Sequence, residues 1–264
     1  MLQSVSFAAN VQSTSPFESD FNSESVPDLP TANANDFSAA TYTAERVEGV
    51  GGKAVGDKAY EATLSGFEYK DERKDMGFQI PFYDNKVLSQ NNLSDLTMEL
   101  SLKYNENCDK VLVSTYSALG SSWDNNTCRT DWVKIEDEKI YVAKTVEETG
   151  TKYLETKVFT DTGMTAEPGK WYRIAVEVHD TMEKSVVYIN GKKIEMSADF
   201  ATNSINVFGH KWAQVNGVLD KKTESGIYDA VKITVDDVET YEGKYKGNMS
   251  VNYNVCLLYT SRCV

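Results

Sequence analysis

Acidic residues near the amino terminus have a spacing that invites comparison with a hydrolase site. The segment ESDFNSE carries Glu18, Asp20 and Glu24. A retaining glycoside hydrolase needs two carboxylates about 5 Å apart, one as nucleophile and one as acid and base. Glu24 shares the strand parity of Asp20, but the letters NSES disfavour a strand and no alternating apolar residues support one. We therefore interpret these residues as loop residues or calcium ligands, and we assign no catalytic residue.

A second group of residues, in the segment SSWDNNTCRTDW, has the composition of a sugar-binding surface. Aromatic rings stack on sugar faces, while amide and guanidinium groups form paired hydrogen bonds with hydroxyls. This composition predicts carbohydrate contacts from Trp123, Asn125, Asn126 and Arg129. For Trp123, packing of its own loop is an equal alternative. Trp132 begins a strand, and we expect it in the core.

The two histidines of the chain lie in different settings. His179 falls on the side of its predicted strand that faces away from the core, which favours a solvent-facing or hydrogen-bonded histidine. His210 lies in the segment FGHKW, close to Trp212. We add His210 and Trp212 to the candidate sugar-binding set. Because no partner residue accompanies His210, we give it no catalytic role.

The chain contains 4 cysteines, and two of them fall in an unusual carboxyl terminus. Residues 256–261 read CLLYTS, which matches, codon for codon, the translation of a transposon end used to prepare DNA sequencing libraries. We interpret residues 256–264 as an artefact of sequence assembly. Cys108 and Cys128 then remain. In an exported protein they would form a disulfide that stabilises the fold by about 3 kcal/mol, and two unrelated thiols are the alternative.

The fold must position these side chains, and we expect it to do so with β-strands. The alternation of apolar and polar residues that predicts a strand is clearest in the segment GKWYRIAVEVHDTMEKSVVYINGKKI. Apolar residues alternate over 172–178, which predicts a half-buried antiparallel strand with Arg173 on its polar face. Asn190-Gly191 is a strong hairpin signal, because a type I′ turn needs positive φ at both central residues. A two-residue loop then places Val187 opposite Ile194.

Alternation elsewhere predicts an all-β chain. Strands are expected over 76–82, 96–104, 110–116, 131–137, 139–146, 152–160, 204–210 and 226–243. No window of helical length shows a convincing helical period. The apolar phase slips by one residue at Asp236-Asp237, which predicts a β-bulge. Without an internal repeat, a sandwich is favoured over a propeller.

Charge and composition limit the partners of this chain of 264 residues. Its 40 acidic and 27 basic residues give a net charge of −13, which disfavours binding to nucleic acid or to anionic membranes. No apolar run is long enough to cross a bilayer, so we expect no membrane insertion. Abundant Tyr, Phe, Asn, Thr and Ser fit a secreted protein that faces polysaccharides.

Three segments, in order, resemble the concanavalin A-like jelly rolls and, within them, the laminin-G-like modules of bacterial secreted proteins. They are the strand GKWYRIAVEV, the hairpin VYINGKKI and the closing strand DDVETY, and PFESDF at 16–21 resembles the first strand. The resemblance implies a two-sheet antiparallel jelly-roll β-sandwich that often holds carbohydrate on a curved face or on edge loops. We expect a lead-in over 1–14, one domain over 15–246 and a linker over 247–264.

The superfamily also contains glycoside hydrolases and polysaccharide lyases, so the fold alone does not decide the function. ESDFNSE has one residue too many for the hydrolase motif of the family, and the strand motifs of its lyases are absent. The leading expectation is a non-catalytic carbohydrate-binding module of a larger secreted or cell-surface protein. The alternatives are a structural or adhesive spacer and a divergent lyase or hydrolase.

The resemblance also implies that the closing acidic pair lies near the first strand. Hard cations prefer several oxygen ligands. Glu18, Asp20, Asp236 and Asp237 are therefore candidate ligands of a structural Ca²⁺ ion. Solvated charges on a bulge are the alternative.

Overall fold

The computed structural model describes residues 18–19, 21–22, 41–50, 57–65, 74–81, 96–118, 127–148, 154–178, 185–194, 210–219 and 230–242. Within these ranges the chain forms 14 strands, all of them paired antiparallel, and no helix. The described residues accordingly include no helix of the length and hydropathy that a membrane span requires. The all-β prediction is confirmed.

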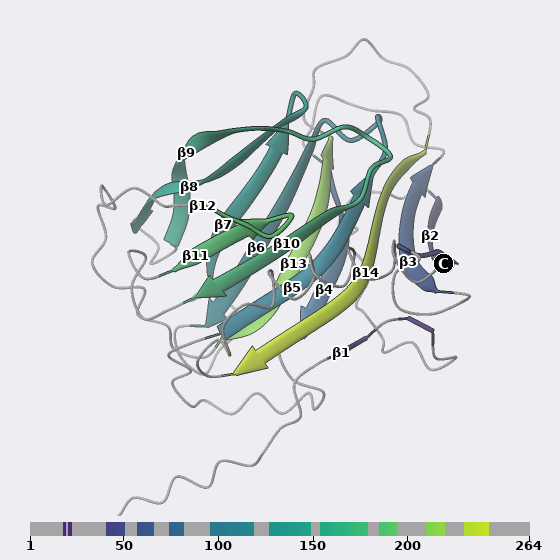
Figure 1. The fold of residues 1–264 in the computed structure, drawn as a ribbon, viewed down its shortest axis with the longest axis horizontal. Helices are drawn as coiled ribbons and strands as arrows, with labels where there is room; N and C mark the ends of the chain where they lie inside the picture. The colour runs from purple at the N-terminus through teal and green to yellow at the C-terminus, as the bar shows by residue number, and fades with distance from the viewer. Residues whose placement is uncertain are drawn as a thin grey trace, which may run out of the picture.

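The strands form two sheets that pack face to face (Figure 1). The eight-stranded sheet has the order β12 (Lys192–Ile194), β11 (Val186–Ile189), β10 (Tyr172–Val178), β5 (Leu96–Tyr104), β14 (Val231–Glu242), β3 (Lys58–Ser65) and β2 (Thr41–Glu48), with β1 (Glu18–Ser19) also paired to β14. The six-stranded sheet has the order β4 (Lys74–Pro81), β13 (His210–Leu219), β6 (Lys110–Ala118), β7 (Thr127–Glu136), β8 (Lys139–Glu148) and β9 (Leu154–Thr165). This is the two-sheet jelly-roll sandwich that the resemblance implies.

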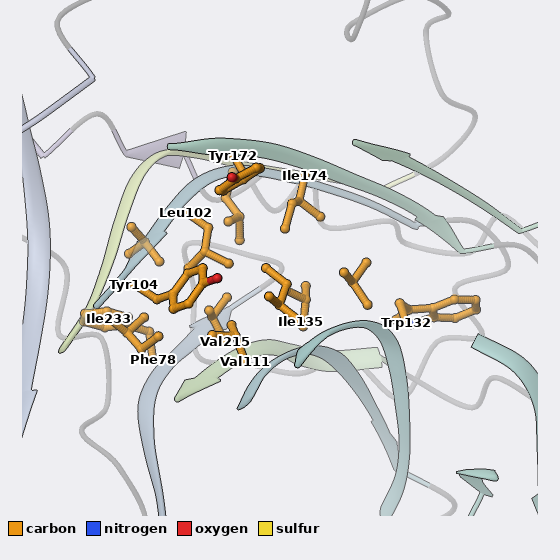
Figure 2. Packing of buried hydrophobic residues seen from close by; sticks show 14 of the residues in the cluster. Phe78, Leu102, Tyr104, Val111, Trp132, Ile135, Tyr172, Ile174, Val215 and Ile233 are labelled. Carbon is orange, nitrogen blue, oxygen red and sulfur yellow. The ribbon is translucent and has the colours of Figure 1, made fainter. Parts of the chain in front are cut away.

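One hydrophobic core fills the space between the two sheets (Figure 2). Leu102 and Ile174 point into it from the eight-stranded sheet, and Phe78 and Val215 from the six-stranded sheet. Trp132 is also fully buried there, and its indole Nε1 donates a hydrogen bond of 2.7 Å to a threonine hydroxyl on β6. The prediction that Trp132 belongs to the core is confirmed.

The predicted hairpin is confirmed in register and in turn type. Asn190 and Gly191 both have positive φ, 49° and 78°, as a type I′ turn requires. Val187 lies opposite Ile194 across β11 and β12. The predicted bulge is confirmed as well, because the β14–β5 register shifts between Asp236 and Glu239.

The polar face of β10 differs from the prediction. The alternation predicted a half-buried strand, but Arg173 is only 5% exposed. Its guanidinium Nε donates to Glu99 Oε1 at 2.6 Å, and its Nη1 donates to the carbonyl of Asp237 at 2.8 Å. Both faces of β10 are therefore buried, since this ion pair satisfies charges that the sequence pattern assigned to solvent.

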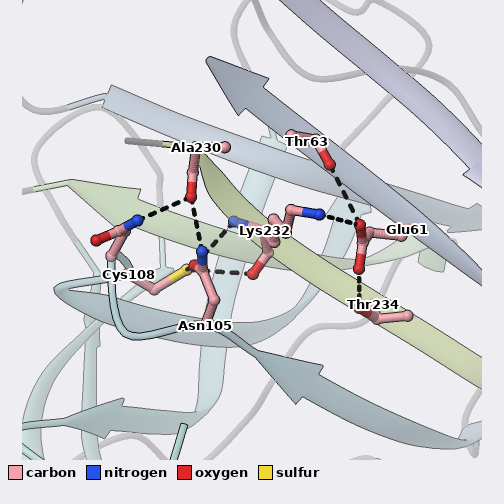
Figure 3. A network of polar contacts seen from close by, with 8 residues as sticks. Glu61, Thr63, Asn105, Cys108, Ala230, Lys232 and Thr234 are labelled. Atoms are coloured by element: carbon pink, nitrogen blue, oxygen red, sulfur yellow. Dashed lines mark hydrogen bonds and ion pairs between the residues drawn. The ribbon is translucent and has the colours of Figure 1, made fainter. Parts of the chain in front are cut away.

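The predicted disulfide between Cys108 and Cys128 is wrong. Cys108 is a buried free thiol whose Sγ lies 3.5 Å from the carbonyl of Lys232 (Figure 3). Cys128 pairs with Ser117 at the opposite end of β6, roughly 20 Å or more away for a strand of this length. A disulfide requires the two Cα atoms to lie within about 7 Å. Burial raises the pKa of the Cys108 thiol to about 12, so the side chain behaves as a packing group.

Strand β13 was not predicted. The sequence predicted a strand over 204–210, of which only His210 lies within the described residues. The inward positions of β13 include Gly217, where an added Cβ would come within 2.8 Å of the Ile233 side chain. A strand with so small an inward residue carries a weak apolar alternation, which explains why β13 was missed.

Candidate functional site

Three buried carboxylates form one cluster at the bulge of β14. Asp236 and Asp237 belong to the bulge, and Asp57 immediately precedes β3. One ligand oxygen of each lies within 4.8 Å of the others. All three residues are at most 3% exposed. Asp237 has a φ of 49°, in the left-handed region, and this residue lies at the bulge within β14.

Backbone amides bind one carboxylate of this acidic cluster. Asp236 accepts hydrogen bonds from the Val50 amide at 2.9 Å and from the Asp237 amide at 2.7 Å. Gly49 passes so close to Asp236 that an added Cβ would come within 2.5 Å of Asp236 Oδ2. A residue with a side chain at position 49 would therefore clash with the Asp236 carboxylate, so this position favours glycine.

Two carboxylates of the cluster are incompletely satisfied, because Asp57 Oδ2 and Asp237 Oδ1 are both buried oxygens with no hydrogen-bond partner. The other Asp57 oxygen, Oδ1, accepts a hydrogen bond from Asn22 Nδ2 at 3.2 Å. A buried carboxylate oxygen without a partner costs free energy unless a proton, a water or a cation binds it.

The cluster also changes the acidity of Asp236. Burial disfavours the charged form, and the neighbouring charges of Asp237 and Asp57 act in the same direction, so that the pKa of Asp236 rises from 3.8 to about 7. The two backbone amides that bind its carboxylate oppose this rise. Three carboxylates in so small a volume are the donor set that a hard divalent cation prefers, and the unsatisfied Asp57 oxygen fits such an ion.

The structure places the predicted calcium ligands as follows. Asp236 and Asp237 both contribute an oxygen to the acidic cluster, and their role as calcium ligands stays a prediction. Glu18 lies in β1, where its backbone pairs with Glu239 next to the bulge, which agrees with a closing acidic pair near the first strand. Asp20 lies outside the described residues. Asp57 was missed, because no spacing in the sequence connects a residue before β3 with the closing strand.

Three of the predicted sugar-binding residues, Arg129, His210 and Trp212, lie on neighbouring strands of the six-stranded sheet. Arg129 on β7 and Trp212 on β13 both pair with Tyr116 on β6, so the three backbones stand side by side in one row. His210 pairs with Ser117, one row further along. Trp123, Asn125 and Asn126 lie outside the described residues, between the end of β6 and the start of β7.

Polar side chains continue along the same strands on the outer face of the sheet. Val215 belongs to the core, so its neighbours Gln214 and Asn216 point away from it. Gln214 pairs with Ser114, and Ser114 with Asp131, which forms a second row. We name these four residues, Ser114, Asp131, Gln214 and Asn216, the polar floor.

The hydrogen bonds of the polar floor are only partly satisfied within the protein. Ser114 Oγ lies 2.5 Å from Asp131 Oδ1 and donates to it. Asn216 is 2% exposed, and its Oδ1 has no hydrogen-bond partner. Neither Gln214 nor Asn216 was singled out from the sequence, because their place on the sheet depends on strand β13, which the pattern did not reveal.

No family model matches the chain, and no curated protein matches it. Among solved structures the chain is similar to an endo-β-1,4-glucuronan lyase from the fungus Trichoderma reesei, with 10% sequence identity, 81% of this chain and 90% of that chain covered, and a TM-score of 0.51. It is also similar to alginate lyase A1-II′, a member of polysaccharide lyase family 7, with 15% identity, 71% and 81% coverage and a TM-score of 0.46. A third similarity is to a mutant of alginate lyase Aly36B, with 11% identity, 88% and 99% coverage and a TM-score of 0.48.

At this level of identity the similarity to the glucuronan lyase shows the fold alone. The concanavalin A-like jelly roll is thereby confirmed, and the laminin-G-like assignment stays a prediction. Function has to be argued from the residues of this chain.

Proposed function

We propose that the chain is a carbohydrate-recognition module whose sugar site lies on the outer face of the six-stranded sheet. The observation that carries the proposal is the row of Trp212, Tyr116 and Arg129 on adjacent strands, next to the polar floor. Aromatic residues beside amide and hydroxyl groups form the usual mixture of a sugar site, since rings cover the sugar faces and polar groups bind its hydroxyls. Trp123, Asn125 and Asn126, which lie outside the described residues, fall in the sequence between the end of β6 and the start of β7.

The composition of the chain supports an exported protein, either secreted or at the cell surface. We further propose that the full protein carries covalently linked neighbouring domains, as is frequent for the modules that this chain resembles. In this setting the module would hold a larger protein on a polysaccharide.

Replacing Trp212 tests the location of the sugar site. Trp212→Ala is expected to weaken retention in affinity gels about tenfold or more, because a stacking aromatic commonly dominates a binding surface. The matched control is Trp171→Ala. Trp171 precedes β10 on the other sheet, where the Lys103 ammonium lies 4.8 Å from its ring centroid. Equal weakening by both variants, or free migration of the unmodified chain through every polysaccharide gel, contradicts the proposal; free migration would leave the spacer function.

A polysaccharide lyase is the second candidate function. A lyase that acts by β-elimination needs a base, commonly Tyr or His, and a group that neutralises the uronate carboxylate. Tyr116, His210 and Arg129 lie in neighbouring rows of one sheet, and the glucuronan lyase with this fold is named for such a reaction. The ultraviolet absorbance of unsaturated uronate ends, measured in the same polysaccharide mixtures, distinguishes catalysis from binding alone.

We also propose that the acidic cluster binds a structural Ca²⁺ ion through Asp57, Asp236 and Asp237. Two observations support this proposal: Asp57 Oδ2 is buried without a hydrogen-bond partner, and the backbone at Gly49 approaches the Asp236 carboxylate closely. The ion would connect the start of β3 with the bulge of β14 and so stabilise the centre of the eight-stranded sheet.

Calcium is expected to stabilise the chain against unfolding. At a concentration of 100 times the dissociation constant, a ligand of the native state alone adds about 2.7 kcal/mol to the free energy of unfolding. Calorimetric titration should give a calcium affinity that Asp57→Asn weakens at least tenfold. The control is Glu48→Gln, which removes one exposed carboxylate from β2, where it pairs with Lys58. A calcium affinity that is unchanged in Asp57→Asn would place the ion elsewhere.

A further inference from the structure

We infer that the amino-terminal strap of the chain and the acidic cluster form one cooperative unit, in which Asn22 positions Asp57 for the cation and the bound cation holds the strap against the sheet. We give the name strap to residues 18–19 and 21–22. The inference rests on the proposed calcium site, to which it adds a positioning residue and a conformational consequence.

The partner of β14 changes at the bulge. Along one edge of β14, β3 pairs with Val231–Val235 and β1 pairs with Val238 and Glu239. Asp236 and Asp237 fall between these two pairings. Figure 1 shows the short β1 beside β14. The acidic cluster therefore lies at the junction where β1 and β3 share an edge of the same strand.

Asn22, at the end of the strap, bridges this junction. Its Nδ2 donates a hydrogen bond to Asp57 Oδ1 at 3.2 Å, and its Oδ1 accepts one from the Lys58 amide at 2.9 Å. An amide side chain can do both, because it carries a donor and an acceptor. The bridge fixes the rotation of the Asp57 carboxyl group and occupies one of its oxygens. The other oxygen, Oδ2, stays buried without a hydrogen-bond partner and is left for a cation.

Phe21 attaches the strap to the core beside the cluster. Its side chain is 1% exposed, and its ring stacks on that of Tyr60, with the centroids 5.7 Å apart. Tyr60 pairs with Val235, the last residue before the bulge. The φ of Phe21 is 54°, a left-handed conformation that costs a bulky residue free energy. Burial of the ring therefore stabilises the docked strap, while the backbone conformation opposes docking.

A cation reaches the cluster only when part of its wall moves, because Asp57, Asp236 and Asp237 are all at most 3% exposed. Strand β3 is eight residues long and pairs on both sides, with β14 and β2. Strand β1 is two residues long and, among the described strands, pairs with β14 alone. Local opening begins where the fewest contacts hold the chain, so the strap is the part that opens.

The cation and the strap stabilise one another. Without a cation, the close carboxylates repel each other in a site away from bulk water. A divalent cation removes this repulsion and binds the oxygen that the Asn22 bridge leaves free. If the docked strap increases the affinity for calcium, calcium must favour docking of the strap by the same factor.

Replacing Asn22 tests the effect of the strap on the ion. Calorimetric titration of the full chain is expected to show that Asn22→Ala weakens calcium binding about tenfold or more, the usual effect of removing a group that orients a metal ligand. The variant retains all three carboxylates of the cluster.

The matched control is Asn105→Ala. Asn105 forms the same kind of bridge at the start of β14, where its Nδ2 donates to the Ala230 carbonyl at 2.6 Å and its Oδ1 accepts from the Lys232 amide at 2.9 Å (Figure 3). Its loss removes two comparable hydrogen bonds away from the bulge. Calcium affinity should therefore be unchanged in Asn105→Ala.

Amide hydrogen exchange tests the effect of the ion on the strap. Exchange of residues 18–22 in the unmodified chain is compared in calcium and in chelator. Calcium is expected to slow it about tenfold or more, the same factor as its coupling to the strap. The hairpin of β11 and β12, at the other edge of the same sheet, should exchange equally in both conditions. In Asn22→Ala the slowing by calcium should shrink several-fold.

The outcomes separate the inference from the calcium site itself. No calcium binding by the unmodified chain overturns both. Binding that Asp57→Asn weakens and Asn22→Ala does not keeps the site and overturns the inference. Equal weakening by Asn22→Ala and Asn105→Ala, or strap exchange that calcium leaves unchanged, overturns it too. If Asn22→Ala does not fold, the exchange measurement on the unmodified chain decides alone.

Discussion

Arg173→Met is expected to lower the free energy of unfolding by about 3–5 kcal/mol, the range found when one partner of a buried ion pair is removed. The Arg173 and Glu99 side chains are 5% and 2% exposed, and their Nε and Oε1 atoms lie 2.6 Å apart. The substitution leaves the Glu99 carboxylate buried without its arginine. It also removes the donor to the carbonyl of Asp237, which holds the bulge of β14. Urea unfolding at pH 7 measures the change.

The control is a solvent-exposed ion pair with the same nitrogen–oxygen distance. Lys170 and Glu167 also lie 2.6 Å apart, but their side chains are 61% and 57% exposed. Lys170→Met is expected to cause no measurable change, because solvent screens such pairs. The double variant Arg173→Met with Glu99→Leu should recover much of the lost stability, since no uncompensated charge remains. A small effect of Arg173→Met alone would show that the pair does not stabilise the sheet.

Without calcium, the free energy of unfolding is expected to fall as the pH rises from about 4 to about 7. The pKa of Asp236 is raised to about 7 in the folded protein and lies near 4 in the unfolded chain. In this interval the native state therefore binds a proton that the unfolded state has released. The contribution of protonated Asp236 to the free energy of unfolding is therefore fully present below pH 4. This contribution, at most about 4 kcal/mol, is lost as the pH rises through 7.

The variant Asp236→Asn isolates this effect from the other carboxylates. Urea unfolding in the presence of a chelator is compared at pH 5 and pH 8. Relative to the unmodified chain, the variant should have a higher free energy of unfolding at pH 8 than at pH 5. The reason is that the amide of the variant has no charge to desolvate, whereas Asp236 is ionised at pH 8. Parallel pH profiles for the two proteins would show that Asp236 titrates normally.

The parts of the fold that the sequence predicted are those determined by local chemistry. Asn190-Gly191 requires a type I′ turn, and this turn alone sets the register of β11 and β12. The slip in apolar phase at Asp236-Asp237 is likewise a local signal, and it located the bulge. Strand β5, with its strict alternation over Leu96–Tyr104, was predicted to the residue.

The parts that the sequence did not predict depend on partners far away in the chain. Arg173 looks like a solvent residue until Glu99 on the neighbouring strand is known. Asp57 joins the acidic cluster only because β3 pairs with β14. The two cysteines suggested a disulfide because they are close in sequence, whereas the strand between them holds them apart. Tertiary pairing decides each of these cases.

Strand β14 lies in the middle of the eight-stranded sheet, between β5 and β3, although it is the last strand described. During synthesis on the ribosome, β3 and β5 emerge long before β14 and cannot pair along these edges until residue 242 has left the exit tunnel. A nascent chain therefore waits with two open sheet edges, which are prone to pair with other chains. We expect this module to complete its folding only after translation has passed its final strand, so that truncations before β14 aggregate rather than form a smaller domain.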